Sequence, residues 1–327
     1  MINEQIAHQI FITDAIESAS DFTQYYEDLA VFYATSLSTV EAIDTARELS
    51  VITSKITRDL SNKLDEYALA NQAVISDITL TEIEAQRQIL AKSGRDIGDI
   101  DEDSVIRKGL QNTVQHQKSI NMIKSWREAV LSQTANTLFS IYNGNETLAS
   151  GKQALTGTKK AQRKDGIAGS AIRSLEIITR TQATAVQNEA KRQAFKKAKS
   201  DGYVYNSILD SNTTSTCRTL HGRKYIWGEG RNPLPPMHYG CRSSIVPYYK
   251  DEPNKLAGQN YYTWLKHQPK EVQDEVLGVR LGKAFRNAGL NQAEFRKITT
   301  NRYAERRTLA EIIASDKRVR DYLQGNS

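Results

Sequence analysis

Both cysteines of the chain lie close together, and each has a histidine nearby. Cys217 and His221 have the spacing C-x3-H, and His238 and Cys241 have the spacing H-x2-C. Thiolate sulfur and neutral imidazole are the ligands that hold zinc in tetrahedral structural sites. These four side chains are therefore a candidate Cys2His2 zinc site, and a small domain with little core would gain stability from bound metal.

Two other arrangements of the same residues also fit the sequence. Cys217 and Cys241 could be a plain pair, either reduced in the cytoplasm or bridged by a disulfide after release from the cell, with both histidines hydrogen-bonded in loops. Alternatively, a cysteine and a histidine could act as nucleophile and base. Catalysis would also need an orienting acid and an oxyanion hole, and only Asp210 stands out as an acid.

Signatures of several enzyme classes are absent from the sequence. It contains no G-x-x-x-x-G-K-[ST], no G-x-G-x-x-G after a predicted strand and no H-E-x-x-H. These absences disfavour a packaging ATPase, a dinucleotide enzyme and a zinc protease. We therefore expect a binding protein and not an enzyme, with no catalytic residues.

Charge is distributed unevenly along the chain. Residues 1–100 hold 7 Lys and Arg against 17 Asp and Glu, whereas residues 151–200 hold 12 against 3. Such a basic run is either a solvated helix face or a surface for a polyanion, because phosphate contact needs density of positive charge but no particular spacing. For the second alternative, the expected DNA-contacting residues are Lys159, Lys160, Arg163, Lys164, Lys191, Arg192, Lys196 and Lys197.

Apolar periodicity predicts that most of the chain is helical. Between about 40 and 92, apolar residues recur at three- and four-residue steps from Leu49 to Tyr67. This stripe either closes a helix bundle on itself or docks another protein. The Gly- and Asp-rich segment 94–104 predicts a loop, and a long helix is expected from about 172 to Gly202.

Three short segments after Gly202 are typical of β-strands. They are YVYNSILD from Tyr203, KYIW from Lys224 and SSIVPYY from Ser243. From Asn260 onward the pattern is helical again, with Trp264 and Leu277 expected in a core. We therefore predict an α+β, predominantly α-helical fold with a helical N-terminal region (1–125), a small β-containing central domain (126–250) and a helical C-terminal tail (251–327).

No membrane role is expected. The N-terminal residues lack a basic stretch followed by an apolar run, and no window approaches the length of a spanning helix. We expect the protein to be made in the cytoplasm of the cell that synthesises it.

Several pieces of the sequence, in this order, resemble a known family. They are Arg180, Thr181, Gln182 and Asn188, then Asp210, Thr213, Cys217 and Gly222, then PPMHYGCRS from Pro235 and finally Pro247. In this combination the chain is similar to the phage head-morphogenesis family of phage Mu F-like and SPP1 minor-head-protein-like domains. NYYTWLKHQP from Asn260 resembles the tail that often follows this domain. Many relatives carry further cysteines where this chain has Leu220 and Ser243, which leaves His221 and His238 as the substitute ligands.

The resemblance implies a minor head protein of a tailed bacteriophage, present in few copies inside the head near the portal. Its implied partners are the portal protein and packaged double-stranded DNA, with the major capsid or scaffold protein as further candidates. The region 1–125 is the expected portal-docking part. Asp210, Thr213, Cys217, Gly222, His238, Cys241 and Arg242 are expected to form a structural knot that shapes the domain, with structural zinc as its one candidate cofactor.

Rival functions remain open at this point. One is a DNA-associated internal protein or a Cys/His hydrolase or transferase delivered with the genome. Another is a soluble scaffold that leaves before maturation, which would be absent from mature particles.

Overall fold

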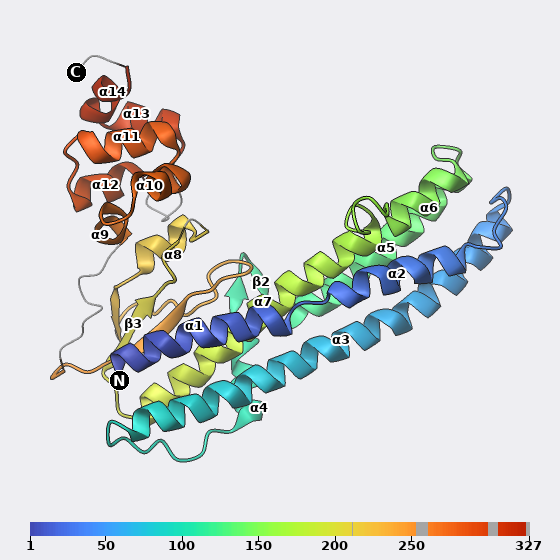
Figure 1. The fold of residues 1–327 in the computed structure, drawn as a ribbon. Coiled ribbons are helices and arrows are strands. Elements are labelled where there is room, and N and C mark those ends of the chain that lie inside the picture. Colours follow the sequence, from blue (N-terminus) through green and yellow to red (C-terminus); the bar gives the residue numbers. More distant parts are fainter. Residues whose placement is uncertain (211, 253–260, 300–306, 325–327) are drawn as a thin grey trace.

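The computed structural model describes residues 1–210, 212–252, 261–299 and 307–324. Long helices form an elongated bundle, a small sheet lies at one end of it, and a lobe of short helices stands beside that end (Figure 1). The predicted α+β, predominantly helical fold is confirmed.

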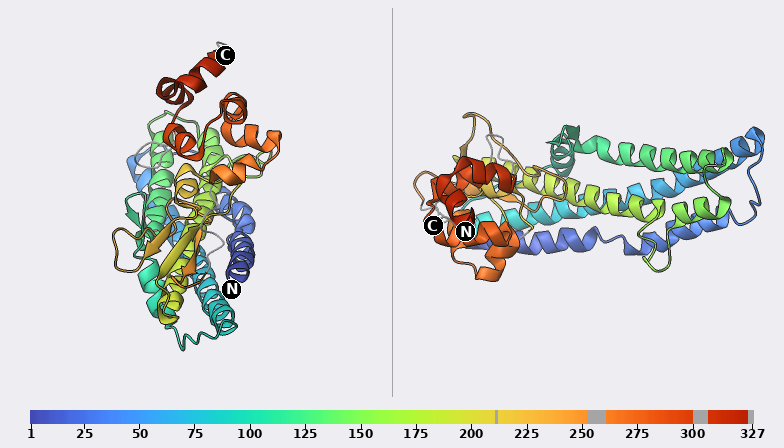
Figure 2. Two further views of the ribbon diagram at one scale, coloured as in Figure 1. Left: turned by 90° about the vertical axis from the view of Figure 1, so that its left-hand side faces the viewer. Right: turned by 90° about the horizontal axis from the view of Figure 1, so that it is seen from above.

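The bundle contains seven α-helices in the first 197 residues. They are α1 (Ile2–Ala19), α2 (Thr23–Ser36), α3 (Ala46–Ala91), α4 (Glu102–Gly109), α5 (Met122–Tyr142), α6 (Leu148–Thr156) and α7 (Ile167–Lys197). Helix α3 begins with a capping box, in which the Thr45 hydroxyl accepts from the Glu48 N–H and the Glu48 carboxylate accepts from the Thr45 N–H. Two views at right angles show how far the bundle extends beyond the sheet (Figure 2).

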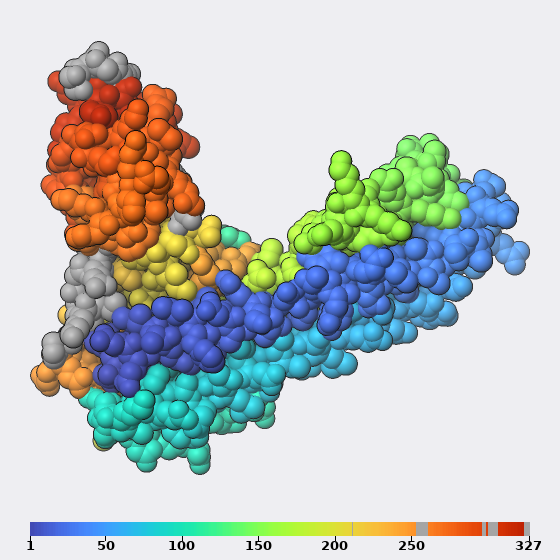
Figure 3. Space-filling view, viewed as in Figure 1, coloured from blue at the N-terminus to red at the C-terminus, as the bar shows by residue number. Residues whose placement is uncertain are grey.

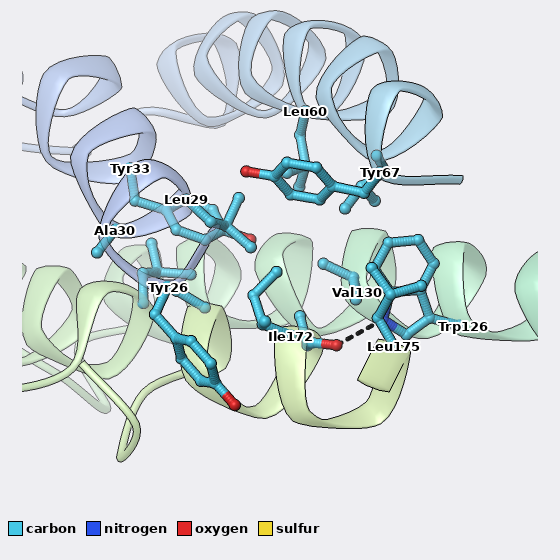
Figure 4. Packing of buried hydrophobic residues seen from close by; sticks show 14 of the residues in the cluster. Tyr26, Leu29, Ala30, Tyr33, Leu60, Tyr67, Trp126, Val130, Ile172 and Leu175 are labelled. Carbon is cyan, nitrogen blue, oxygen red and sulfur yellow. Dashed lines mark hydrogen bonds between the residues drawn. The ribbon is translucent and has the colours of Figure 1, made fainter. Parts of the chain in front are cut away.

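The apolar stripe of α3 closes the bundle on itself. Leu60, Leu64 and Tyr67 are buried in one hydrophobic core with side chains from α2, α5 and the first half of α7. Figure 4 shows Leu60 and Tyr67 facing Trp126 and Ile172 across this core. Of the two alternatives for the stripe, the structure therefore supports the self-contained bundle.

A second core lies at the other end of the bundle. It combines α1, the second half of α3, α4 and the second half of α7 with residues of the sheet, including Ile12, Ile83, Phe195 and Tyr203. Helix α7 thus contributes to both cores. The expected domain division near residue 125 does not coincide with a break in packing, because each core joins residues from both sides of it.

The main sheet has the strand order β4-β3-β5 and is antiparallel throughout. Its strands are β3 (Gly202–Asn206), β4 (Lys224–Ile226) and β5 (Ser244–Tyr248). Strands β4 and β5 lie inside predicted strand segments, and β3 begins one residue before its predicted segment. The short helix α8 (Ser215–Leu220) lies between β3 and β4. Gly202 is required in β3, because a Cβ there would lie 2.0 Å from the carbonyl oxygen of Tyr225.

A two-stranded hairpin was not predicted. It consists of β1 (Thr113–Val114) and β2 (Gln117–Lys118), followed by a 3-10 turn at Ser119–Asn121. The turn residues Gln115 and His116 have φ values of 45° and 73°, which Gly or Asn usually adopts in such turns. Because neither residue type is a turn signal, the sequence gives no local indication of the hairpin.

The C-terminal lobe has its own hydrophobic core. Its helices are α9 (Tyr261–Lys266), α10 (Lys270–Leu277), α11 (Val279–Asn287), α12 (Gln292–Thr299), α13 (Leu309–Ser315) and α14 (Lys317–Gln324). Leu277 is buried and Trp264 packs against the same core, as predicted. Asn260, the first residue of the NYYTWLKHQP string, lies outside the described residues.

The lobe projects from the bundle next to α8 (Figure 3). Among the described residues, the Arg218 guanidinium lies 4.5 Å from the ring centre of Tyr261, and Leu209 packs against the lobe core, so both contacts join the lobe to the central part. Across the described residues, no helix combines the length and apolar character needed to span a membrane.

Candidate functional site

Cys217, His238 and Cys241 form a compact cluster below helix α8. The two Sγ atoms are 3.6 Å apart, and Cys217 Sγ is 3.2 Å from His238 Nε2. One ligand atom from each residue lies within 4.8 Å of the others, and both cysteines are buried. The thiols are free and not joined in a disulfide. The structure thus brings together three of the four residues expected as zinc ligands.

His221 is not part of the cluster. Its Nδ1 accepts a hydrogen bond from the backbone N–H of Ser207 at 2.9 Å. Burial lowers the pKa of His221 to about 4, so the ring is neutral and its Nε2 carries the proton. The four-ligand set expected from the sequence is therefore wrong for His221. This side chain holds the backbone after β3 in place and offers no free lone pair to a metal.

The two thiols differ in acidity because they share a hydrogen bond. Hydrogen bonding to Cys241, together with burial, raises the pKa of Cys217 to about 12. Burial alone would raise the pKa of Cys241, but hydrogen bonds from Cys217, Met237 and Ser243 outweigh it and lower this pKa to about 6. Of the two thiols, Cys241 is therefore the one that ionises more readily.

Helix α7 holds the segment that carries Cys241. The Thr181 hydroxyl accepts from the N–H of Gly240 at 2.9 Å, and the Thr184 hydroxyl donates to the carbonyl of Cys241 at 2.8 Å. The Asn188 side chain donates to the carbonyl of Ser243 at 3.2 Å. The motif residues Thr181 and Asn188 thus satisfy the backbone of a buried loop.

Thr184 was missed by the sequence analysis. Thr181, Thr184 and Asn188 recur at steps of three and four residues, so they lie on one face of the helix. This polar stripe on one face of the helix was the available signal. Its meaning depends on burial, which the sequence does not show.

The remaining residues of the expected knot lie around the cluster. Arg242 donates to the Asp210 carboxylate at 2.7 Å, and Thr213 donates to the same oxygen at 3.0 Å. Burial raises the pKa of Asp210, but the hydrogen bond and charge of Arg242 outweigh it and lower the pKa below 3.8. Gly222 has a φ of 75° and donates to the carbonyl of Tyr205 at 2.8 Å, which turns the chain into β4.

Two cavities flank the 240–242 segment. One is lined by Cys217 and His238 and has a volume of about 20 Å³, which is room for a single water molecule. The other, about 250 Å³, lies between α1 and α7 and is lined by Glu17, Arg180 and Gln187. Cys241 also lines this larger cavity. The space beside Cys217 and His238 is far smaller than a substrate pocket, and the cavity beside Cys241 is slightly smaller than the usual size of such a pocket.

The eight basic residues expected to contact DNA do not form one surface. Lys159, Lys160, Arg163 and Lys164 lie in the loop before α7, which we call the loop patch, and three of them are exposed. Arg163 is half-buried, donates to the Gly157 carbonyl at 2.8 Å and forms an ion pair with Glu27. The other four residues lie near the end of α7, about 36 to 45 Å from its start at 1.5 Å per helical residue.

The second group is largely occupied by contacts within the chain. Arg192 forms hydrogen bonds with Glu189, Lys196 lies over the ring of Trp227, and the Lys197 ammonium donates to the Asp99 carbonyl at 2.6 Å. Lys191 is completely buried, and its Nζ lies 3.9 Å from Glu82. As a buried partner of a carboxylate, Lys191 cannot contact DNA, and the prediction was wrong for this residue.

Comparison with known proteins tests the resemblance. Residues 143–246 match the family model described as Phage Mu protein F like protein. Over these residues the chain is similar to the Mu F-like family. The match covers about a third of the chain and confirms the resemblance seen in the sequence. No curated protein and no solved structure matched the chain.

The Mu F-like domain contains α6, α7, the main sheet except the end of β5, and the whole cysteine and histidine cluster. The family match supports the assignment of the chain as a phage head-morphogenesis protein and as a component of the virion. Both basic groups also lie inside it. The cluster, the polar face of α7 and the sheet therefore form one structural unit.

Proposed function

We propose that the protein is a minor head protein that acts at the portal vertex of a tailed phage, in head assembly and in DNA packaging or ejection, without catalytic turnover. The observation that carries this proposal is the Mu F-like match over residues 143–246. The single-water cavity at Cys217 and His238 supports a non-enzymatic role, since a substrate needs a larger pocket. An enzyme delivered with the genome is the less favoured alternative for the same reason.

The proposed DNA-contacting surface is the loop patch. Its position is fixed by close packing, because a Cβ on Gly169 would lie 2.3 Å from the carbonyl oxygen of Arg163. Lys159, Lys160 and Lys164 project from this anchored loop and are exposed. A rigid loop bearing exposed ammonium groups suits contact with phosphates, and it has no element that would read base sequence.

Reversing the charge of the loop patch should weaken DNA binding and its dependence on salt. In Lys159→Glu/Lys160→Glu/Lys164→Glu, each lost phosphate contact should reduce the slope of log affinity against log salt by about 0.9. Fluorescence anisotropy with two unrelated duplexes measures both affinity and sequence preference. We expect equal affinities for the two duplexes.

The matched control reverses three exposed basic residues of the C-terminal lobe, Lys270→Glu/Arg280→Glu/Lys283→Glu, which changes the net charge equally. The control should bind DNA like the unmodified chain. Equal loss in both triple variants would mean that total charge and not the loop patch determines binding, and a flat response to salt would refute phosphate contact.

The proposed portal-docking surface lies on the acidic N-terminal helices. Val51, Leu69 and Leu80 of α3 are exposed by 61%, 65% and 50%, although large apolar side chains are usually covered. Their separations of 18 and 11 residues correspond to whole numbers of helical turns, so they lie along one face of α3. Exposed carboxylates lie within one helical turn of Leu69 (Asp65 and Glu66) and of Leu80 (Asp77 and Glu84). This part of the line suits a basic, partly apolar partner.

Aspartate substitutions on this face should abolish co-purification with the portal protein of the same phage. The test is Val51→Asp/Leu69→Asp, and the matched control is Val279→Asp in the C-terminal lobe, where the side chain is 59% exposed. Circular dichroism establishes that the variants fold. Undiminished portal capture by the α3 variant would exclude this face. Deleting residues 1–100 is a poor test, because α3 supplies part of both cores.

A further inference from the structure

The geometry points to a zinc site in which Cys217, His238 and Cys241 are the three protein ligands and the fourth position is open to a water molecule. This inference goes beyond the proposed role in head assembly, and it replaces the four-ligand site suggested by the sequence. It rests on the spacing of the ligand atoms, the orientation of His238 and the cavity beside the cluster.

Two of the three pairs of ligand atoms already have nearly the spacing that a tetrahedral ion requires, and the third pair lies within 4.8 Å. With zinc–sulfur and zinc–nitrogen bonds of about 2.3 and 2.0 Å, tetrahedral geometry places two sulfur atoms about 3.8 Å apart and sulfur and nitrogen about 3.5 Å apart. The observed separations are 3.6 Å between the Sγ atoms and 3.2 Å between Cys217 Sγ and His238 Nε2. An ion therefore needs only a few tenths of an ångström of expansion between these pairs.

His238 is oriented as a metal ligand. Its Nδ1 lies 2.9 Å from the carbonyl oxygen of Tyr239, so Nδ1 carries the proton and donates it. The unprotonated Nε2 then faces Cys217 Sγ with its lone pair. A histidine whose other ring nitrogen donates to a backbone carbonyl is typical of zinc sites, since that bond fixes the tautomer and the ring orientation.

The surroundings of the sulfur atoms are also suited to a bound ion. The Tyr205 hydroxyl lies 3.5 Å from Cys217 Sγ, within hydrogen-bonding distance for sulfur, and is fully buried. On the other side, Thr184 and Asn188 of α7 fix the backbone around Cys241. Ligands on α8 and on the segment before β5 are thus held by elements that do not depend on the metal.

The fourth ligand does not come from His221, whose Nδ1 is occupied by Ser207. Instead, Cys217 and His238 line the cavity of about 20 Å³, and Thr213, Arg242 and Ser243 are among the other residues that line it. This volume fits one water molecule, and polar groups surround it. Three protein ligands and one water are the arrangement of zinc sites that retain an open position.

A disulfide fits the same atoms less well. It requires the two sulfur atoms to approach to about 2.05 Å, so the observed separation of 3.6 Å would have to shorten by about 1.5 Å. That contraction would pull Cys241 away from the contacts that hold its backbone to α7. It would also leave the lone pair of His238 without a partner.

The test measures metal in the purified full-length chain and in single variants. Elemental analysis of the unmodified chain should give one zinc per molecule. His238→Gln should lower bound zinc by more than about tenfold, as expected for loss of one of three ligands. His221→Gln is the matched control and should keep the full zinc content. Competition with a chromogenic chelator on the unmodified chain gives the affinity without depending on any variant.

Cobalt substitution tests the ligand set and the open position. Co²⁺ bound to the unmodified chain should show thiolate charge-transfer absorption in the near ultraviolet and strong tetrahedral bands in the visible. Added azide should change the visible bands, because it replaces the water at an open position. An unchanged spectrum would indicate a closed site.

Several results would overturn the inference. The first is that the chain contains no metal after purification in the presence of zinc. The second is that its intact mass without reductant is two daltons lower than with reductant, and the third is that His221→Gln and His238→Gln lose equal amounts of zinc. If His238→Gln fails to fold, chelator competition and the cobalt spectrum of the unmodified chain still decide the question. None of these outcomes affects the DNA and portal tests, so the two proposals can fail separately.

Discussion

Replacing Glu82 by glutamine is expected to lower the free energy of unfolding by about 3–5 kcal/mol, because it leaves the buried Lys191 without its counter-charge. Both side chains are completely buried, and Lys191 Nζ lies 3.9 Å from Glu82 Oε1. His8 of α1 lies 3.0 Å from the other Glu82 oxygen, and Gln86 donates to Glu82 Oε1 at 2.7 Å. This network joins α1, α3 and α7, so its loss affects three helices.

The effect should depend on pH in both directions. Burial raises the pKa of Glu82, but Lys191, His8 and Gln86 outweigh burial and lower this pKa below 4.5. The stabilisation by ionised Glu82 is therefore present above pH 4.5 and is lost as pH falls through the pKa that Glu82 has in the folded protein. Burial lowers the pKa of Lys191 below 10.5, with only partial opposition from Glu82. A base whose pKa is lowered by folding destabilises the protein at pH values below the pKa that it has in the unfolded chain. The loss of unfolding free energy in Glu82→Gln should therefore become smaller as pH rises toward 10.5.

Denaturant unfolding at several pH values measures this deficit. The control is Glu82→Gln/Lys191→Met, which removes both charges while keeping the volumes similar and should recover most of the stability. If the double variant is as unstable as Glu82→Gln, the ion pair is not the source of the loss.

Replacing Trp126 by alanine should cost about 3–5 kcal/mol, since it removes a large buried side chain and leaves a cavity in the core. Trp126 is 5% exposed, and its Nε1–H donates to the carbonyl of Ala171 at 2.8 Å, the bond drawn in Figure 4. Because Leu60 and Ile172 belong to the same core, the helices on both sides of residue 125 should unfold in one transition of lower midpoint.

Thermal unfolding followed by circular dichroism tests this expectation. Trp264→Ala in the C-terminal lobe is the control, since Trp264 packs against a separate core and should leave the main transition unchanged. Two separate transitions in Trp126→Ala, one retaining the signal of residues 1–125, would show that the N-terminal helices are an independent domain.

Local patterns predicted the elements well. The stripe through Leu60 and Tyr67 repeats over many turns, and the three strands are bounded by Gly, Asn or Pro, so short-range sequence determines them. The approach of Cys217, His238 and Cys241 also followed from their positions in the sequence, because a small three-stranded sheet leaves little distance between the loops around it.

Long-range packing could not be predicted in the same way. Lys191 looks like its basic neighbours in the sequence, and only the position of Glu82, more than 100 residues earlier, shows that it is buried. His221 has acceptable ligand spacing, yet Ser207 occupies its nitrogen. Helices on both sides of residue 125 fill the same two cores, and this packing depends on partners that are remote in sequence. In each case the deciding partner lies on another element.

The length of α7 constrains how this domain can change. The helix presents Ile172 and Leu175 to one core, and farther along it presents Thr181, Thr184 and Asn188 to the cysteine segment. Inserting one residue between these two groups would rotate the second by about 100° and advance it by about 1.5 Å, which turns the hydroxyls away from the backbone they hold. Insertions of about seven or eleven residues, two or three full turns, keep the two faces in phase. The reach from the loop patch to the cluster should therefore vary by whole numbers of helical turns and not continuously.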